Sequence, residues 1–216
     1  MSRALVLSAV LVFLLTSASP TSMLLDEQHI DSVGDADNII ISEILVSPNG
    51  MKNTEECTNC YNATDWNGDG EYGSYSDQFI ELHNPTSQAI NVSNWVLDDK
   101  PDGGSAPCQI ARNTVIPANG YISIFRNASR IELDYFDADS VSLTDTSGLL
   151  VHQISYQAEG IFYGNTYITE EDGSLGSTSP PTPGFAPGES FTSAQNMVGC
   201  FGISDGGRVD AMVLQG

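Results

Sequence analysis

The chain has 216 residues and a formal net charge of −21, because 28 Asp and Glu residues stand against 7 Lys and Arg residues. A surface this acidic repels phosphate backbones, which argues against nucleic acid as a partner, and it attracts cations. At this length, one domain with extensions is the natural expectation. A saline habitat, in which acidic surfaces stay hydrated, is the simplest explanation of the charge.

The first 18 residues have the three parts of a secretory signal peptide. Arg3 supplies the positive start, residues 4–15 form an apolar run, and small residues at 16–18 offer a cleavage point. The run is shorter than the roughly 20 residues of a spanning helix. We therefore expect a secreted or cell-surface protein with no membrane insertion after cleavage; an uncleaved anchor is the alternative. Residues 19–38 are polar and acidic and predict a flexible leader.

A short strand is predicted at Phe79–His83, in which Ile80 and Leu82 share one face and the two polar residues share the other. An Asn-Pro-Thr-Ser turn then leads to a second strand, which carries Trp95 and Leu97 on one side. Two half-buried strands joined by a polar turn indicate an antiparallel sheet with one solvated face.

Other strands are predicted from β-branched runs that end at turn signals. They cover residues 39–46, 108–110 and 115–125, and a hairpin over 140–156. No heptad, helical period or internal repeat is present in the sequence. The pattern as a whole predicts an all-β protein.

The stretch IELHNPTSQAINVSNWVLDD at residues 80–99 resembles the signature of the lamin-tail domain, in its secreted prokaryotic type. The segments ISEI at 41–44, IPANGYISIF at 116–125 and PTPG at 181–184 are similar to other parts of that family. Asn94 stands where the family usually has glycine. The resemblance implies an immunoglobulin-like antiparallel β-sandwich, and it says more about fold than about activity.

The resemblance also divides the chain. It covers residues 39–184 and is interrupted by an insertion at 51–76, while residues 185–216 form a C-terminal extension outside it. The extension contains two apolar stretches that predict one or two added strands. A Pro-rich segment at 180–187 predicts an extended path along the surface.

Four cysteines, an even number in a chain expected to be exported, favour disulfides. Cys57 and Cys60 could pair locally, which would leave Cys108 and Cys200 to tie the tail to the sandwich. A four-cysteine zinc site is the alternative, although only one half has the C-x-x-C spacing.

The insertion carries oxygen ligands at alternate positions, an arrangement that can wrap one calcium ion with about six to eight oxygens. These residues are Asp65, Asn67, Asp69 and Glu71, with Gly70 before the last. The spacing matches the first half of an EF-hand loop, but its twelfth position is Ser76 and the next acid, Asp77, comes one place late. We predict a structural calcium site closed by Asp77; a well-solvated acidic turn is the alternative.

Aromatic side chains also gather on the insertion, and rigid aromatics can stack on a sugar or on a protein partner. They are Tyr61, Trp66, Tyr72 and Tyr75. Packing against the edge of the sandwich is the alternative.

No catalytic constellation is legible. Glu43 and Glu81 could form a hydrolase pair, but such strand carboxylates more often bind the backbone of a neighbouring loop. His29, His83 and His152 are scattered without metal spacing, and the latter two are expected on a solvated strand face.

We therefore expect a secreted, non-catalytic β-sandwich that acts as an interaction module, with calcium as its cofactor and an extracellular protein or glycan as its partner. One alternative is a structural envelope component anchored by its N-terminal segment. Another is an accessory module of a secreted hydrolase or nuclease system, since family members are sometimes joined to such enzymes.

Overall fold

The computed structural model describes residues 38–48, 64–100, 103–157, 164, 166–178, 180–189, 193–204 and 207–208. The predicted signal peptide, the predicted leader except Asn38, and the first half of the insertion lie outside the described residues. Among those described, strands account for nearly all regular structure. The exceptions are two four-residue helices, α1 (Ser74–Asp77) and α2 (Arg126–Ser129).

The first sheet has five antiparallel strands in the order β11-β10-β1-β2-β7. The strands are β1 (Ile40–Leu45), β2 (Phe79–His83), β7 (Tyr121–Phe125), β10 (Thr166–Thr169) and β11 (Leu175–Thr178). The strands predicted at 39–46 and 79–83 are confirmed. The pair β10 and β11 was not predicted, because neither strand shows a clear alternation of apolar and polar residues.

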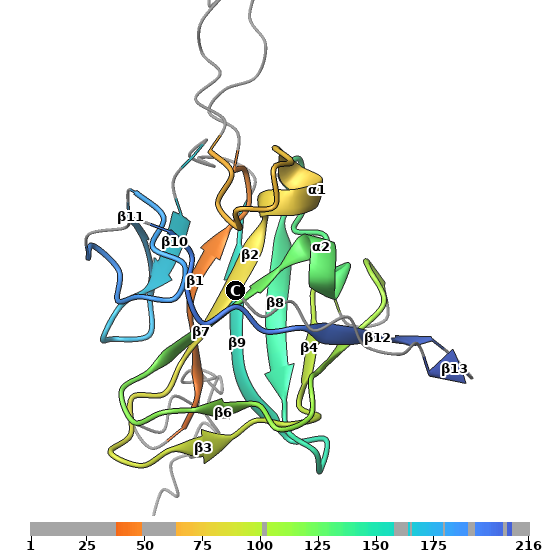
Figure 1. Ribbon diagram of the computed structural model, residues 1–216, viewed down its shortest axis with the longest axis vertical. Coiled ribbons are helices and arrows are strands. Elements are labelled where there is room, and N and C mark those ends of the chain that lie inside the picture. Colours follow the sequence, from red (N-terminus) through yellow and green to blue (C-terminus); the bar gives the residue numbers. More distant parts are fainter. Residues whose placement is uncertain are drawn as a thin grey trace, which may run out of the picture. The chain divides into compact units, whose positions relative to one another are not determined.

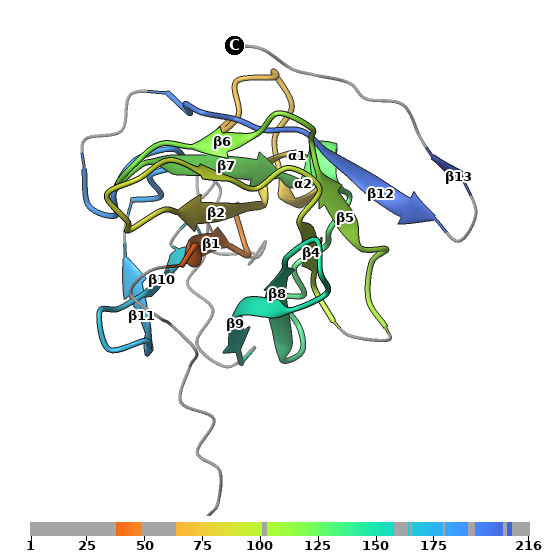
Figure 2. The same cartoon turned by 90° about the horizontal axis from the view of Figure 1, so that it is seen from below.

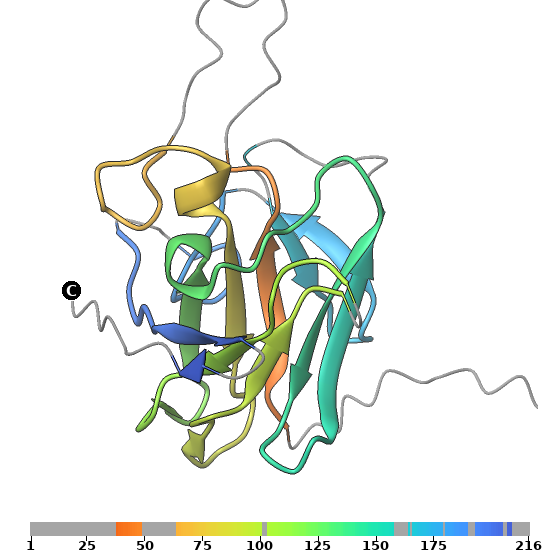
Figure 3. The ribbon, with the colours of Figure 1, turned by 90° about the vertical axis from the view of Figure 1, so that its right-hand side faces the viewer.

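The second sheet has six strands in the order β13-β12-β5-β4-β8-β9 and forms the other layer of the sandwich (Figures 1, 2 and 3). The strands are β4 (Val96–Asp98), β5 (Cys108–Ile110), β8 (Asp139–Thr144), β9 (Leu150–Tyr156), β12 (Cys200–Ser204) and β13 (Gly207–Arg208). A two-stranded ribbon pairs β3 (Ile90–Asn91) with β6 (Val115–Ile116). β8 and β9 pair antiparallel as neighbours in the sheet, so the hairpin predicted over residues 140–156 is confirmed.

The core lies between the two sheets and follows from the period of two along each strand. From β2, Ile80 and Leu82 enter it, while β8 contributes Val141 and Leu143. Trp95 packs against this cluster from a partly buried position. Burying each such side chain stabilises the fold by about 1.5–3 kcal/mol, so the core is the main source of stability.

The predicted pairing of the strands on either side of residues 84–87 is wrong. β2 pairs with β1 and β7, whereas β4 lies in the other sheet between β5 and β8. The Asn84 amide donates hydrogen bonds to the carbonyls of Gln88, Ile116 and Pro117, and so holds the crossing loop beside β6. Asn94 adopts φ 63°, a left-handed conformation that glycine and asparagine tolerate best, which explains how it replaces the family's glycine.

The C-terminal strap, defined as residues 180–189 and 193–200, crosses the outer face of the first sheet on its way to β12 (Figure 1). The backbone of Ser123 on β7 donates to Asn196 and accepts from Val198. Residues 181–184 are buried, so the prediction that the Pro-rich segment at 180–187 runs along the surface is wrong for these four residues. The outer face of the first sheet was expected to be solvated, but the strap covers part of it.

Candidate functional site

The described part of the insertion, residues 64–77, folds around its own carboxylates. Asp65 accepts the backbone amides of Gly68, Asp69 and Gly70 at 2.7, 3.1 and 2.8 Å. Turns of this kind form because a short acidic side chain can reach amides two to five residues further on. The sequence thus specifies the loop locally.

Asp69 is the centre of the loop and links it to α2. Its carboxylate accepts hydrogen bonds from Ser76 at 2.7 Å, from Asn127 at 2.8 Å and from Asn67 at 3.0 Å. Burial acts to raise its pKa, but these donors together with the Glu71 amide lower it below the ordinary value. Asp69 is therefore ionised, and its charge is already satisfied by protein donors.

Asp77 closes the base of the loop from a fully buried position. Its two oxygens accept the amides of Trp66 at 2.7 Å and Gly73 at 2.8 Å. Burial raises the pKa of Asp77 to about 6, and the negative charges of Asp65 and Asp69 act in the same direction. The three acids are thus close enough to influence one another.

Within the described residues no group of three or more His, Cys, Asp or Glu side chains is arranged to hold a metal ion. Ser76, the twelfth position, donates to Asp69, and Glu71 is exposed. The oxygens of Asp65, Asp69 and Asp77 face internal donors rather than one shared centre. The calcium site expected at these residues and Asn67 stays a prediction.

Trp66 is buried, so its predicted place among the interaction residues is wrong, and the alternative, packing against the sandwich, holds for this residue. It joins Leu45, Phe79 and Phe125 in a second apolar cluster on the outer side of the first sheet. Tyr72 and Tyr75, in contrast, are 62% and 58% exposed. Tyr61 lies outside the described residues.

Tyr75 is held in place by two arginines of α2 and its C-cap. The guanidinium carbons of Arg126 and Arg130 lie 5.6 and 5.9 Å from the centre of its ring, and Arg130 also donates a hydrogen bond to the hydroxyl. Cation–π contacts at this range are attractive. Arg126 also forms an ion pair with Glu132 at 2.9 Å. Sequence reasoning missed these arginines, because they lie more than fifty positions from Tyr75 in the chain.

Glu43 and Glu81 lie opposite one another on β1 and β2, and both are fully buried. Glu43 accepts the amide of Thr182, and Glu81 accepts the amide of Gly184. The expected alternative, carboxylates that bind the backbone of a neighbouring segment, is therefore confirmed. No substrate reaches this pair while the strap covers it, which excludes it as a hydrolase pair in this conformation.

The two described histidines differ in environment. His152 is buried, and its Nδ1 accepts the amide of Ile41 from the opposite sheet at 3.2 Å, so its expected place on a solvated face is wrong. Burial lowers the pKa of His152 to about 4, so the ring is neutral. His83 is half-buried and stacks on Tyr121, with ring centres 4.1 Å apart. His29 lies outside the described residues.

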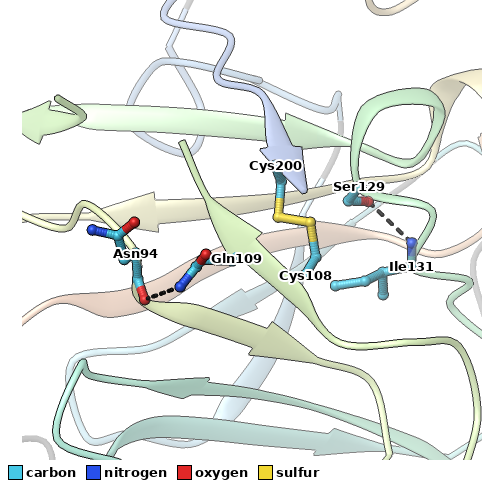
Figure 4. The surroundings of a disulfide bond; sticks show 6 residues. All are labelled: Asn94, Cys108, Gln109, Ser129, Ile131 and Cys200. Atoms are coloured by element: carbon cyan, nitrogen blue, oxygen red, sulfur yellow. Dashed lines mark hydrogen bonds between the residues drawn. A yellow bond between two sulfur atoms is a disulfide. The ribbon is translucent and has the colours of Figure 1, made fainter. Parts of the chain in front are cut away.

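The predicted pairing of Cys108 with Cys200 is confirmed (Figure 4). Their Cα atoms are 5.6 Å apart, and the bond joins β5 to the start of β12 across 92 positions of sequence. Both cysteines are buried. Because these two thiols are oxidised, they are not available to the four-cysteine zinc site considered above. Cys57 and Cys60 lie outside the described residues.

Two antiparallel sheets packed face to face define an immunoglobulin-like β-sandwich. The Lamin Tail Domain family model matches residues 32–158, more than half of the chain, and the chain belongs to this family. The family is one of structural, generally non-catalytic domains. No curated protein matches the chain. The family match ends just after β9, so β10–β13 and the C-terminal strap lie beyond it.

Within the described residues no helix has the length and apolar character needed to cross a membrane.

Proposed function

We propose that the protein is a secreted, non-catalytic lamin-tail-like β-sandwich that acts as an interaction module outside the cell or at its surface. Family membership supports the non-catalytic part. The observation that carries the interaction role is the exposure of Tyr72 and Tyr75, together with the two arginines that contact the ring of Tyr75. The partner is an extracellular protein or a glycan.

Tyr75 combines exposure with order, which suits an anchor at an interface. Its ring is fixed by Arg126 and Arg130, so little conformational entropy is lost when a partner covers it. Arg130 is exposed and is one of the few positive charges on a protein of net charge −21, whereas the charge of Arg126 is paired with Glu132. A partner that offers an apolar surface to Tyr75 and hydrogen-bond acceptors to Arg130 would therefore be favoured.

The interaction role is tested with the mature exported chain on an array of neutral and acidic oligosaccharides and on immobilised extracellular proteins of the host. We expect Tyr75→Ala to weaken binding at least tenfold, a loss of about 1.4 kcal/mol. Leu149→Ala is the matched control, because this side chain is 64% exposed in the turn between β8 and β9. Equal losses in both variants, or no binding by the wild type to either set, would contradict the proposal.

We further propose that calcium stabilises the loop at 64–77. Mutual repulsion among Asp65, Asp69 and Asp77 supports this proposal, since a bound cation relieves such repulsion. Calcium should raise the melting temperature of the wild type and leave that of an Asp65→Asn, Asp69→Asn double variant unchanged. If neither calcium nor a chelator changes the melting temperature of the wild type, the calcium proposal is contradicted.

Two observations separate this function from its alternatives. Retention of residues 1–18 in the mature protein, measured by mass spectrometry, would favour an anchored envelope component. Metal-dependent turnover on a panel of polysaccharides and nucleic acids would favour a role in a secreted hydrolase or nuclease system.

A further inference from the structure

Two buried carboxyl groups hold the C-terminal strap on the first sheet. Glu43 and Glu81 are direct partners in the antiparallel register of β1 and β2, and both are 0% exposed. Side chains at such positions lie on the same face of the sheet, with Cβ atoms about 5 Å apart. The face they share is the outer one, which the strap covers.

The donors to these carboxyls come largely from the strap. Glu43 accepts the Thr182 hydroxyl at 2.8 Å and the Thr182 amide at 3.2 Å, and Glu81 accepts the Gly184 amide at 2.7 Å. The backbone of Phe185 in the strap also acts on Glu81, and two hydroxyls of the first sheet donate as well, Thr166 at 2.6 Å from Glu43 and Ser42 at 2.8 Å from Glu81. Every one of these residues except Phe185 is buried, so the carboxyls and the strap depend on one another for their hydrogen bonds.

The surroundings of the pair do not neutralise two negative charges. On β7 the residue opposite Glu81 is the uncharged Ser123. The titratable neighbours are the stacked His83 and Tyr121, and Glu189 of the strap, whose negative charge acts on Tyr121 as that of Glu81 does. Among the described residues, no lysine or arginine forms an ion pair with either glutamate.

Burial, and then the charge of Glu43, raise the pKa of Glu81 well above the ordinary value of 4.5. Burial also raises the pKa of Glu43, although hydrogen bonds from Thr166 and Thr182 oppose the shift. The folded protein therefore keeps a proton on the pair to higher pH than the unfolded chain does. This contribution to stability is complete below about pH 4.5 and is lost as the pH rises through the folded-state pKa.

We propose that Glu43 and Glu81 form a proton-controlled latch, which holds residues 181–185 on the sheet while the pair carries one proton and loosens them when both carboxyls ionise. When the proton is on the Glu81 oxygen that faces Ser42, the direction of that hydrogen bond is reversed and Glu81 donates to the Ser42 hydroxyl, while its other oxygen still accepts the Gly184 amide. Loss of that proton places two negative charges side by side in a buried site, and lifting the strap admits water to them. The Cys108–Cys200 disulfide keeps the far end attached, so the opening is local and reversible. The latch goes beyond the proposed function and does not depend on it.

Hydrogen exchange of the Thr182 and Gly184 amides, expressed as protection factors, tests the latch between pH 5 and pH 9. We expect wild-type protection to fall at least tenfold as the pH rises. Glu81→Gln cannot ionise but keeps an acceptor for Gly184, so its protection should stay high across the range. Glu189→Gln is the matched control: it removes an exposed negative charge from the strap and should behave like the wild type.

The reciprocal variant Glu43→Gln also removes one charge of the pair, and it replaces Glu81→Gln if that variant does not fold. Its protection should likewise be independent of pH. Constant protection in the wild type, or a fall in the Gln variants equal to that of the wild type, would overturn the proposal. A fall that Glu189→Gln alone abolishes would also overturn it, because general repulsion within the strap would then explain the effect.

Discussion

Two groups of carboxylates in this protein accept hydrogen bonds from the same kinds of donor, yet their pKa values shift in opposite directions. In the loop at 64–77, Asp65 and Asp69 bind backbone amides two to five positions away, and both side chains stay in contact with water. Beneath the C-terminal strap, Glu81 and Glu43 bind backbone amides of the strap that are 103 and 139 positions away, and no part of either side chain is exposed. Hydrogen bonds lower the pKa of Asp69, whereas burial outweighs them at Glu81 and raises it.

This difference shows that the donors do not by themselves set the charge of an acid. Water in the loop leaves the ionised form cheap, so added donors stabilise it further. Under the strap, water is excluded and a second acid lies alongside, so the proton is retained. The loop is therefore stabilised by the ionised carboxylate of Asp69, whereas the strap is held most firmly when the pair Glu43 and Glu81 keeps a proton.

The largest expected effect comes from releasing the far end of the strap. Replacing Cys108 and Cys200 together by serine removes a cross-link that spans 92 positions, which should cost about 4–5 kcal/mol in the free energy of unfolding. Urea unfolding of the wild type and the double variant measures this difference. A loss below about 1 kcal/mol would mean that the latch at Glu43 and Glu81 is enough to hold the strap without the disulfide.

Burial disfavours the charged form of a base as it does that of an acid, so it lowers the pKa of a buried histidine where it raises that of a buried glutamate. The folded-state pKa of His152 is about 4, below its ordinary value of 6.5, so its stability contribution is present above pH 6.5 and is lost as the pH falls toward 4. The loss at pH 4 should approach about 3 kcal/mol. Thermal unfolding of the wild type and His152→Gln across this range measures it, since Gln keeps an acceptor for Ile41 but does not titrate. Parallel curves for the two proteins would show that His152 is not the group responsible.

An intermediate loss of stability is expected at Asp77, which belongs to the loop but is as fully buried as Glu43 and Glu81. Asp77→Ala leaves the amides of Trp66 and Gly73 without their acceptor, at a cost of about 2–3 kcal/mol. Asp77→Asn retains one acceptor and should lose about half as much. Chemical denaturation measures both variants, and equal stability of Asp77→Ala and the wild type would show that water replaces the carboxylate there.

The smallest effect is expected at Asp65, where water competes for the same amides. Asp65→Ala should cost about 1 kcal/mol or less without calcium, although this carboxylate accepts three hydrogen bonds. The same denaturation experiment measures it. A cost equal to that at Asp77 would show that exposure does not separate the two groups of carboxylates.

The predictable parts of the molecule are those that short stretches specify. The strand β2 follows from local alternation, and β1, β8 and β9 follow from β-branched runs that end at turn signals. The pairing of Cys108 with Cys200 was reached by leaving Cys57 and Cys60 to each other, which the described residues do not test.

The unpredictable parts depend on what covers a surface. Glu81 and His152 occupy polar positions of alternating strands, which indicate solvent, yet both are buried. Thr182 and Gly184 cover Glu81 from about one hundred positions away, and the amide that His152 accepts belongs to the opposite sheet. No local pattern carries such information. The arginines that hold Tyr75 were missed for the same reason.

The strap also determines where the chain can be cut. A fragment that ends with the family match at residue 158 would lose β10 to β13 together with the strap. It would bare two acids and the apolar patch of Phe79 and Phe125, and it would leave Cys108 as an odd thiol. Such a fragment should aggregate or form mixed dimers during purification, so recombinant work on this protein needs a boundary beyond Cys200.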